Sequence, residues 1–309
     1  MVARGGHLRY YRCRFIEGLE SVQTLGQLDM LRTAVAQLTQ DGSRLALVPT
    51  MGALHEGHIA LVREAARHAD HVAVSIFVNP TQFGPNEDLN AYPRQMAADS
   101  AMLEAEGVAL LWAPSVQVMY PQGFASSIAV EGVSAGFCGA ARPGHFDGVA
   151  TVVCKLFHQV LPHVALFGEK DWQQLAVIRA MARDLDLTRP HMTDIVGMPT
   201  VRESDGLAMS SRNRYLSAEQ RMAAVALPNG MQNAIAQIEA GTSPARALGN
   251  LREALKAAGF DRVDYAALAD ADTLEPLDEL ETRPARLLVA ARIGGTRLID
   301  NMPVNNPAK

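Results

Sequence analysis

The sequence predicts an α/β protein in which a doubly wound parallel sheet is followed by a smaller α+β unit. Three observations lead to this prediction. The chain of 309 residues is long enough for about two domains. Short apolar runs alternate with helical patterns from residue 45 to residue 185, and this alternation is typical of parallel strand–helix units. Beyond residue 199, alanine-rich helical segments are followed by strands.

The elements of the first part follow from hydrophobic periodicity. A helix through Leu31, Ala34 and Leu38 ends at Asp41–Gly42, and apolar runs of strand length then alternate with segments that have one apolar face. Strands are expected at 45–48, 72–78, 108–112 and 164–167, and helices at 57–68, 94–106, 148–160 and 171–185. Because ligands of such sheets bind at the carboxyl ends of the strands, we expect functional residues in the loops that follow them.

The second part begins near residue 199 and has a different order of elements. Helical segments are expected at 217–240 and 244–258. Strands are expected at 263–268, 286–291 and 297–301, and the last two are expected to form a hairpin across Gly294–Gly295. We therefore divide the chain into an extension (1–21), a larger domain (22–199) and a smaller domain (200–309).

Composition and charge narrow the class of function. Hydrophobic residues make up 48% of the chain and charged residues 20%, which is typical of a globular protein and excludes a disordered or fibrous one. The formal net charge of -5 provides no bulk attraction to nucleic acid. No apolar run approaches the roughly 18 residues of a membrane-spanning helix. We therefore expect neither a nucleic-acid partner nor a membrane.

The cysteines and residues 1–21 indicate the cellular compartment in which the protein is expected. Cys13, Cys138 and Cys154 lie far apart and form no Cys-x-x-Cys pair, so neither a disulfide framework nor a structural zinc site is predicted. A reducing cytoplasm is expected. Residues 1–21 form a basic extension that we expect to be poorly ordered, and they lack the features of a transit or secretory signal. A short extension or an upstream start codon is the interpretation we favour.

The strongest functional signal is the segment Leu47-Val-Pro-Thr-Met-Gly-Ala-Leu-His-Glu-Gly-His58. It runs from a strand through a glycine-bearing turn into a helix, where His55 and His58 can share one face. The free N–H groups and the positive dipole end of that helix favour a polyphosphate. A zinc-protease site is excluded, because that motif needs histidines four residues apart. For an isolated His-x-x-His, two histidines that merely cap or fill the turn are the alternative.

The second segment, Val78–Phe83, follows the next predicted strand and contains Asn79 and Gln82. Neutral amides suit a hydroxylated or carboxylate-bearing small molecule, because a buried amide left unpaired disfavours analogues that lack the partner group. Taken alone, the segment is equally consistent with an ordinary Asn-Pro turn.

The third segment, Gly168-Glu-Lys-Asp171, ends another predicted strand and is followed by Trp172-Gln-Gln174. Lys170 offers a point charge for phosphate, and Asp171 can accept hydrogen bonds from ribose hydroxyls or cap the next helix. Gly168 allows a ligand close to the backbone. By itself the segment could be a surface turn.

The fourth segment, Met209-Ser-Ser-Arg212, lies just beyond the expected domain boundary. An arginine can bind two phosphate oxygens at once, and a mobile loop can make that contact late, when charge builds up on the leaving group. Ser-Ser-Arg alone has little specificity.

In their order along the chain, these segments resemble the pantothenate synthetase (pantoate–β-alanine ligase) family of the nucleotidyltransferase superfamily with the His-x-Gly-His signature. The resemblance runs from about Val22 to Val304. Trp172 stands where we would expect tyrosine. The resemblance rests on Pro49–His58, Asn79–Phe83, Arg142-Pro-Gly-His-Phe146, Gly168–Asp171, Met209–Asn213 and Thr296-Arg-Leu-Ile-Asp-Asn301.

The resemblance implies an ATP-dependent ligation of D-pantoate and β-alanine to pantothenate, on the route to coenzyme A. A pantoyl-adenylate is the implied intermediate, and AMP and pyrophosphate are released. The larger domain is implied to be Rossmann-like, to bind ATP and pantoate and to form a homodimer, with the smaller domain as a lid. Mg²⁺ is expected to be held mainly by the ATP phosphates, with no metal site of protein side chains and no prosthetic group.

The resemblance also implies roles for single residues. His58 is the expected proton or hydrogen-bond donor to the phosphates, His55 its helper, and Lys170 the third catalytic residue. The amides expected to hold pantoate are those of Gln82, Gln174 and the supporting Asn79, and Gln82 is also expected to meet β-alanine. The expected ATP-binding residues are Pro49, Thr50, Met51, Gly52, Ala53, Leu54, His55, Glu56, Gly57, His58, Gly168, Glu169, Lys170, Asp171, Val201, Met209, Ser210, Ser211 and Arg212.

Two other functions fit parts of the pattern. A related nucleotidyltransferase would couple a nucleotide to a phosphorylated alcohol, but Gln82 and Gln174 favour a carboxylate over a phosphorylated substrate, which would need more basic residues. A nucleotide sensor or scaffold would keep the fold without turnover. The presence of every polar residue of the site argues against that alternative.

Overall fold

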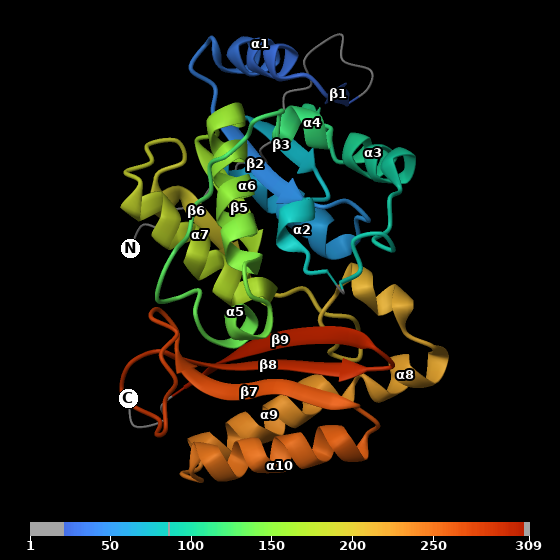
Figure 1. The fold of residues 1–309 in the computed structure, drawn as a ribbon, viewed down its shortest axis with the longest axis vertical. Coiled ribbons are helices and arrows are strands. Elements are labelled where there is room, and N and C mark those ends of the chain that lie inside the picture. Colours follow the sequence, from blue (N-terminus) through green and yellow to red (C-terminus); the bar gives the residue numbers. More distant parts are fainter. Residues whose placement is uncertain (1–21, 86, 306–309) are drawn as a thin grey trace, which may run out of the picture.

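The computed structural model describes residues 22–85 and 87–305, so the extension expected at 1–21 lies outside the described residues. Two sheets organise the described part of the chain (Figure 1). The larger sheet has the order β1-β4-β3-β2-β5-β6 and is parallel, and the smaller has the order β7-β8-β9 and is antiparallel. The predicted fold class is confirmed. Within the same described ranges, no helix is both long enough and apolar enough to cross a membrane.

The larger unit contains the strand–helix alternation that the sequence predicts. Its strands are β1 (Gln23–Leu25), β2 (Leu45–Thr50), β3 (His71–Ile76), β4 (Leu110–Trp112), β5 (Val164–Gly168) and β6 (Ile195–Met198). Its helices are α1 (Leu28–Thr39), α2 (Glu56–His68), α3 (Met96–Ala105), α4 (Val116–Met119), α5 (Phe137–Ala141), α6 (His145–Val160) and α7 (Trp172–Asp184). Short 3₁₀ turns are η1 (Pro80–Gln82), η2 (Glu169–Asp171), η3 (Met192–Asp194) and η4 (Ser211–Tyr215).

Side chains that alternate along β2 explain why helices cover both faces of the sheet. Leu45 and Leu47 point into a core that α1, α6 and α7 complete. Ala46 and Val48 point into the opposite core, which α2 and α3 complete. A strand buried on both faces needs apolar residues at consecutive positions, and this run supplies four of them, all fully buried.

The strand order places the carboxyl ends of β2 and β5 side by side. From β2 the chain passes through α2 to β3 on one side of the sheet, whereas β5 pairs with β2 on the other side. Loops that leave two such strands in opposite directions form the crevice in which α/β proteins bind ligands. The histidine segment follows β2 and the Lys170 turn follows β5, so the fold brings these two segments to one place.

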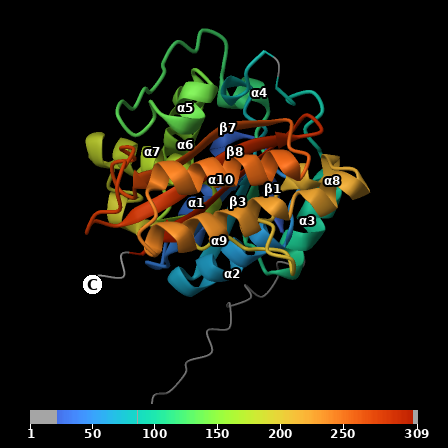
Figure 2. The same ribbon diagram turned by 90° about the horizontal axis from the view of Figure 1, so that it is seen from below.

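The smaller unit is a three-stranded meander covered by two helices. Figures 1 and 2 show α9 and α10 side by side on the face of this sheet that is turned away from the larger unit. The hairpin predicted across Gly294–Gly295 is confirmed, and both glycines have the positive φ that a two-residue turn of this kind favours. The elements are α8 (Ala218–Ala223), α9 (Ala226–Glu239), α10 (Pro244–Ala257), β7 (Arg262–Asp270), β8 (Ala285–Ile293) and β9 (Thr296–Val304).

Candidate active site

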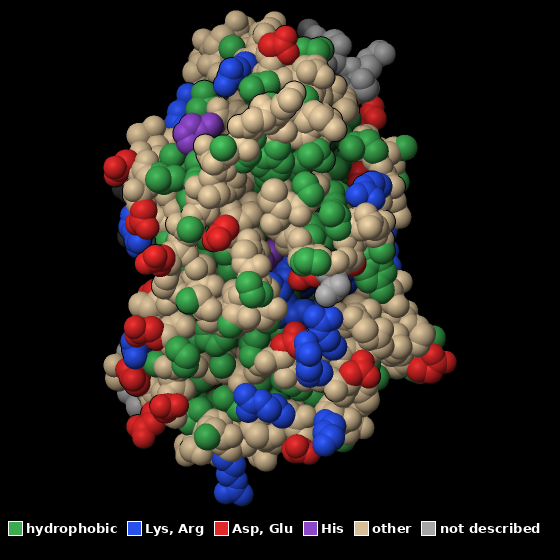
Figure 3. Space-filling model, viewed as in Figure 1, with side chains coloured by type: hydrophobic (Ala, Val, Ile, Leu, Met, Phe, Trp, Pro, Cys, Tyr) green, Lys and Arg blue, Asp and Glu red, His purple; other side chains and the backbone are tan. Residues whose placement is uncertain are grey.

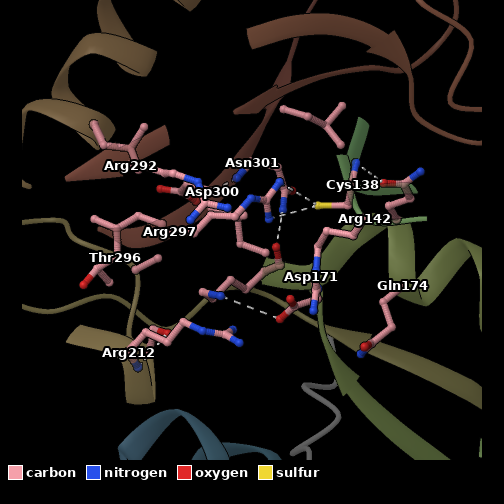
Figure 4. Close-up of a pocket in the computed structure, with 18 of the residues that line it drawn as sticks. Cys138, Arg142, Asp171, Gln174, Arg212, Arg292, Thr296, Arg297, Asp300 and Asn301 are labelled. Carbon is pink, nitrogen blue, oxygen red and sulfur yellow. Dashed lines mark hydrogen bonds and ion pairs between the residues drawn. The ribbon is translucent and has the colours of Figure 1, made fainter. Parts of the chain in front are cut away.

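Two neighbouring cavities lie beside the turn that follows β5, and the first of them also reaches the carboxyl end of β2. The first, about 230 Å³ in volume, is lined by His55 and His58, and we call it the histidine cavity. The second, about 220 Å³, lies against β9 and is lined by Asp300 and Asn301 (Figure 4); we call it the cleft cavity. Figure 3 shows Lys and Arg side chains gathered where the two units meet, a charge that suits an anionic ligand. The residues that line both cavities are Lys170, Asp171, Gln174, Ser210 and Arg212.

The histidine cavity brings together residues from all four sequence segments. The predicted site residues on its wall are Pro49, Thr50, Met51, His55, Gly57, His58, Asn79, Gln82, Gly168, Lys170, Asp171, Gln174, Val201, Met209, Ser210, Ser211 and Arg212. The structure places the other five predicted residues away from the walls of both cavities, and these are Gly52, Ala53, Leu54, Glu56 and Glu169.

ATP contact stays a prediction for these five residues, and the structure shows what surrounds four of them. The side chains of Ala53 and Leu54 are buried in the core, and their N–H groups each donate to the carboxylate of Asp99 at 2.9 Å. Glu56 is exposed in the first turn of α2. Glu169 forms an ion pair of 3.1 Å with an arginine of β8. The side chains of these four residues do not line either cavity.

The two histidines cap the helix that carries them. His55 is the N-cap of α2, and its Nδ1 accepts a hydrogen bond from the N–H of Gly57 at 3.2 Å. The Nδ1 of His58 accepts one from the N–H of His55 at 3.3 Å, which completes a capping box. Because Nδ1 is the acceptor on each neutral ring, the proton must lie on Nε2. The two histidines therefore cap the helix through their Nδ1 atoms, as the alternative interpretation expected. Each ring keeps an Nε2–H group that can donate to a ligand.

Both imidazoles are held in the neutral form. Burial lowers the pKa of His55 to about 4, and the positive charges of Lys170 and Arg214 act in the same direction. Burial, followed by the neighbouring His55, lowers the pKa of His58 to about 3. At pH 7 both rings of the protein alone are neutral, so the structure favours hydrogen-bond donation by His58 over proton donation.

Asn79 is the N-cap of η1 and Gln82 is its last residue, and the two amides differ in how firmly the protein engages them. Asn79 is 1% exposed, and its Nδ2 donates to the carbonyl of Gly148 and to Oε1 of Gln82, both at 3.1 Å. Its Oδ1 accepts from the hydroxyl of Tyr120 at 2.8 Å. Gln82 donates through Nε2 to the thioether of Met51, a weak acceptor that a carboxylate can replace. Asn79 therefore orients Gln82, and Gln82 is the amide available to a ligand.

Two adjacent glutamines at the start of α7 have different tasks. Gln173 is buried, donates to the carbonyls of Val133 and Gly136, and accepts from the N–H of Cys138. Gln174 lines both cavities, and among the described residues its amide has no hydrogen-bond partner. Gln173 stabilises the fold, while Gln174 leaves an amide available in the cavities.

The guanidinium of Arg212 is engaged within the protein. Its Nε and one terminal nitrogen donate to the two carboxylate oxygens of Asp88 at 3.1 and 3.0 Å. The hydroxyl of the neighbouring Ser211 lies 3.3 Å from that of Tyr92. Asp88 and Tyr92 belong to the larger unit, so the loop that carries Arg212 is tied across the site. A phosphate that binds Arg212 must share it with Asp88 or displace that carboxylate.

The segment Arg142-Pro-Gly-His-Phe146 is part of the family resemblance, but no role was expected for its side chains. His145 donates through Nδ1 to the backbone carbonyl of Gln82 at 2.8 Å and accepts through Nε2 from Arg142 at 2.9 Å. Arg142 donates to the same carbonyl at 3.2 Å and pairs with Glu87 at 2.6 Å. These residues fix the backbone that presents Gln82. An Arg and a His three residues apart before a helix were the only local signal.

We expect the folded chain to lose stability as the pH is lowered from 7 to 5. Burial, together with the charge of Arg142, lowers the pKa of His145 to about 4. In the unfolded chain the same imidazole has its ordinary pKa of about 6.5 and takes up a proton in this range. The unfolded state therefore binds more protons than the folded state, and the free energy of unfolding decreases. Urea unfolding midpoints at several pH values measure the effect.

The variant His145→Gln keeps a donor and an acceptor but does not titrate, so its unfolding midpoint should depend less on pH between 7 and 5 than that of the wild type. The control Asn250→Ala replaces an exposed amide of α10, which carries no titratable group, and should leave the dependence unchanged. An identical pH dependence in His145→Gln and the wild type would show that His145 is not held neutral by the fold.

Comparison with known proteins shows the family of the chain. The family model for pantoate-beta-alanine ligase matches residues 23–303. A pantothenate synthetase of Novosphingobium aromaticivorans is 68% identical over 283 residues, which are 92% of this chain and 99% of that protein. The crystal structure of a pantothenate synthetase from Thermus thermophilus has a TM-score of 0.85 at 48% identity, covering 92% of this chain and 99% of the other.

A second similar solved structure is a complex with ligands. It is a pantoate-beta-alanine ligase from Francisella tularensis complexed with Beta-gamma ATP and Beta-alanine, with a TM-score of 0.77 at 32% identity. The similarity covers 92% of this chain and 98% of the Francisella chain. A family model that spans nearly the whole described chain, a close relative and two solved structures agree: the chain belongs to the pantoate–β-alanine ligase family.

Proposed function

We propose that this protein joins D-pantoate to β-alanine at the expense of ATP, through a pantoyl-adenylate, with release of AMP and pyrophosphate. The observation that carries the proposal is the convergence of His55, His58 and Lys170 on one cavity. The amide of Gln174 lies beside them and has no hydrogen-bond partner in the part of the chain that the structure describes. The relatives named pantothenate synthetase and the Francisella complex with Beta-gamma ATP and Beta-alanine support the same substrates.

In the first step, a carboxylate oxygen of pantoate attacks the α-phosphorus of ATP. The new P–O bond forms while the P–O bond to the pyrophosphate leaving group breaks. The Nε2–H groups of His55 and His58 donate to phosphate oxygens, and Lys170 supplies a positive charge where negative charge increases. Neutral imidazoles suit this task, because hydrogen-bond donation stabilises the charge without a proton transfer.

In the second step, the uncharged amine of β-alanine attacks the carbonyl carbon of the adenylate and AMP leaves. The amide bond forms as the bond between carbonyl carbon and phosphate oxygen breaks, and the amine proton goes to solvent or to the departing phosphate. Gln82, oriented by Asn79, would hold the acyl group and meet the incoming amine. Positioning of this kind turns a bimolecular reaction into an effectively unimolecular one.

The residues present fit Mg²⁺ that is held mainly by ATP. Within residues 22–85 and 87–305, no group of three or more His, Cys, Asp or Glu side chains could hold a metal ion. Asp171 lines both cavities, where its carboxylate lies 3.7 Å from the ammonium group of Lys170, and the carboxylate of Asp88 is engaged by Arg212 through two hydrogen bonds. One carboxylate together with substrate phosphates is a usual environment for Mg²⁺, and the bound ion would neutralise phosphate charge. We propose no prosthetic group.

We further propose that the two units are domains that meet near residue 199 and that the smaller one acts as a lid. The contact between Arg212 and Asp88 supports this, because it joins the loop after residue 199 to the larger unit across the site. From the family resemblance we also propose a homodimer formed by the larger domain and a cytoplasmic location.

The substitution Gln174→Glu should raise the KM for pantoate on the order of 10- to 100-fold, because a like charge replaces a donor to the substrate carboxylate. The KM for ATP should change far less. The control Gln232→Glu adds the same charge at an exposed position of α9 and should leave both constants unchanged. Steady-state kinetics with each substrate varied in turn provide the test. An unchanged KM for pantoate in Gln174→Glu would remove this residue from the pantoate site.

The reaction is tested by products formed from ATP and pantoate, with and without β-alanine. We expect pantothenate and AMP in equal amounts when all three substrates are present. Consumption of a phosphorylated alcohol without pantothenate formation would favour the related nucleotidyltransferase. ATP binding detected by calorimetry without any product would favour a nucleotide sensor.

A further inference from the structure

We propose that Asp300 and Asn301, consecutive residues of β9, are positioning residues that hold the two phosphate-facing segments of the site relative to each other. These segments are the turn that carries Lys170 and the loop that carries Arg212. Figure 4 labels Asp300, Asn301 and Asp171 among the residues that line the cleft cavity. The inference rests on the proposed function, which leaves the segment 296–301 without a role.

Asn301 fixes the two peptide groups on either side of the Lys170 α-carbon. Its Nδ2 donates to the carbonyl of Glu169 at 2.8 Å and to the carbonyl of Lys170 at 2.9 Å. Its Oδ1 accepts from Arg286, which also pairs with the carboxylate of Glu169 at 3.1 Å and stacks on the ring of Trp172 at 3.5 Å. One buried amide thereby sets the orientation of two consecutive peptide groups next to the catalytic lysine.

Asp300 fixes the base of the other segment. Its carboxylate accepts two hydrogen bonds from Arg202, at 2.6 and 2.9 Å, and Arg202 also donates to the carbonyl of Gly206 at 3.0 Å. The N–H of Met209 donates to the carbonyl of Val201 at 3.0 Å and closes this loop just before Arg212. A buried carboxylate paired with a forked guanidinium is a rigid anchor, because breaking the pair would leave a buried charge.

The side-chain polar atoms of Asp300 and Asn301 already form hydrogen bonds within the protein. The two residues therefore act on the site through the residues that they hold. Asp300 is 2% exposed and Asn301 is 4% exposed. Both carboxylate oxygens of Asp300 accept hydrogen bonds, and the amide of Asn301 uses its nitrogen and its oxygen. A ligand in the cleft cavity therefore meets Lys170 and Arg212 rather than these side chains. Because charge stabilisation depends on fixed geometry, loosening either anchor should slow the chemical step more than it weakens binding.

A double-mutant cycle between Asn301 and Lys170 tests the inference. We expect Asn301→Ala to lower the kcat for pantoate-dependent AMP formation about 10- to 100-fold, with the KM for pantoate nearly unchanged. In a Lys170→Ala background the same substitution should lower kcat less than about 3-fold, because the group through which it acts is gone. Asn301→Ser keeps one donor, so its loss should be intermediate, and it takes the place of Asn301→Ala if that variant does not fold.

The controls separate this role from a merely structural one. Asn250→Ala removes an exposed amide of α10 that donates to Gln237, and it should leave kcat unchanged. Equal losses from the Asn301 variant in both backgrounds, or a loss confined to thermal stability, would overturn the inference. These outcomes are distinct from a failure of the proposed function, in which the wild-type protein itself would form neither AMP nor pantothenate.

Discussion

Replacing His58 with glutamine should lower the rate of pantoate-dependent AMP formation about 10²- to 10⁴-fold while the fold is kept. The variant removes the Nε2–H donor from the cavity. Glutamine is an ordinary residue at this position of a capping box, so its amide oxygen can replace Nδ1 as the acceptor for the N–H of His55. Single-turnover measurement of AMP isolates the first step, and circular dichroism reports the fold.

A second variant at the same position separates capping from chemistry. His58→Ala loses the donor and the acceptor together, so it should be as slow as His58→Gln and also less stable by about 1 kcal/mol. His68→Gln, at the exposed end of the same helix, should retain wild-type rate and stability. A folded His58→Gln enzyme with the wild-type rate would refute the role given to this imidazole.

Lys170→Ala should lower the same rate about 10²- to 10³-fold, because it removes one of the two positive charges, with that of Arg212, that line both cavities. Lys170→Arg should recover only part of the loss, since a planar guanidinium does not replace a compact ammonium group. Lys256→Ala, at an exposed position in the last turn of α10, is the matched control and should be fully active.

The same substitution has a spectroscopic consequence. The charge of Lys170 helps to lower the pKa of His55, so its removal should raise that pKa. Titration of the His55 ring by NMR in the wild type and in Lys170→Ala measures the change. A His55 pKa that does not rise in Lys170→Ala would show that the two groups are not close in solution.

Much of the fold could be predicted because the central strands are buried on both faces. The run Leu45–Val48 has no polar residue and can only be a buried element, which the length of the run identifies as a strand. Strands β1 and β6 at the edges of the sheet were not predicted. They have three and four residues, and β1 is mostly polar, so neither gives a periodic signal.

The site was predictable to the extent that each segment follows a strand or a domain boundary. A parallel sheet gathers the loops at one edge, and so His58 and Lys170 could be placed together from the sequence. The hydrogen-bond and ion-pair partners of the site residues could not be predicted from the sequence. Asp88 and Arg212 are 124 residues apart, and Asn301 reaches carbonyls more than 130 residues upstream, so only the tertiary fold reveals these pairs.

The histidine pKa values and the consequence of Trp172 also depend on packing. The pKa of His58 is lowered mainly by burial, a property that spacing alone does not encode. Trp172 was expected to be tyrosine, and the structure shows what the larger side chain does. Its Nε1 donates to the carbonyl of Ala271 at 2.8 Å, and its ring packs against Arg286. The tryptophan therefore joins α7 to the smaller unit beside the Lys170 turn.

The most direct test of the central claim is isotope exchange between labelled pyrophosphate and ATP. If pantoate captures AMP in a separate first step, label should enter ATP when pantoate and Mg²⁺ are present and β-alanine is absent, and omission of pantoate should abolish the exchange. Formation of pantothenate by an enzyme that shows no pantoate-dependent exchange under any of these conditions would contradict a stepwise reaction through an adenylate.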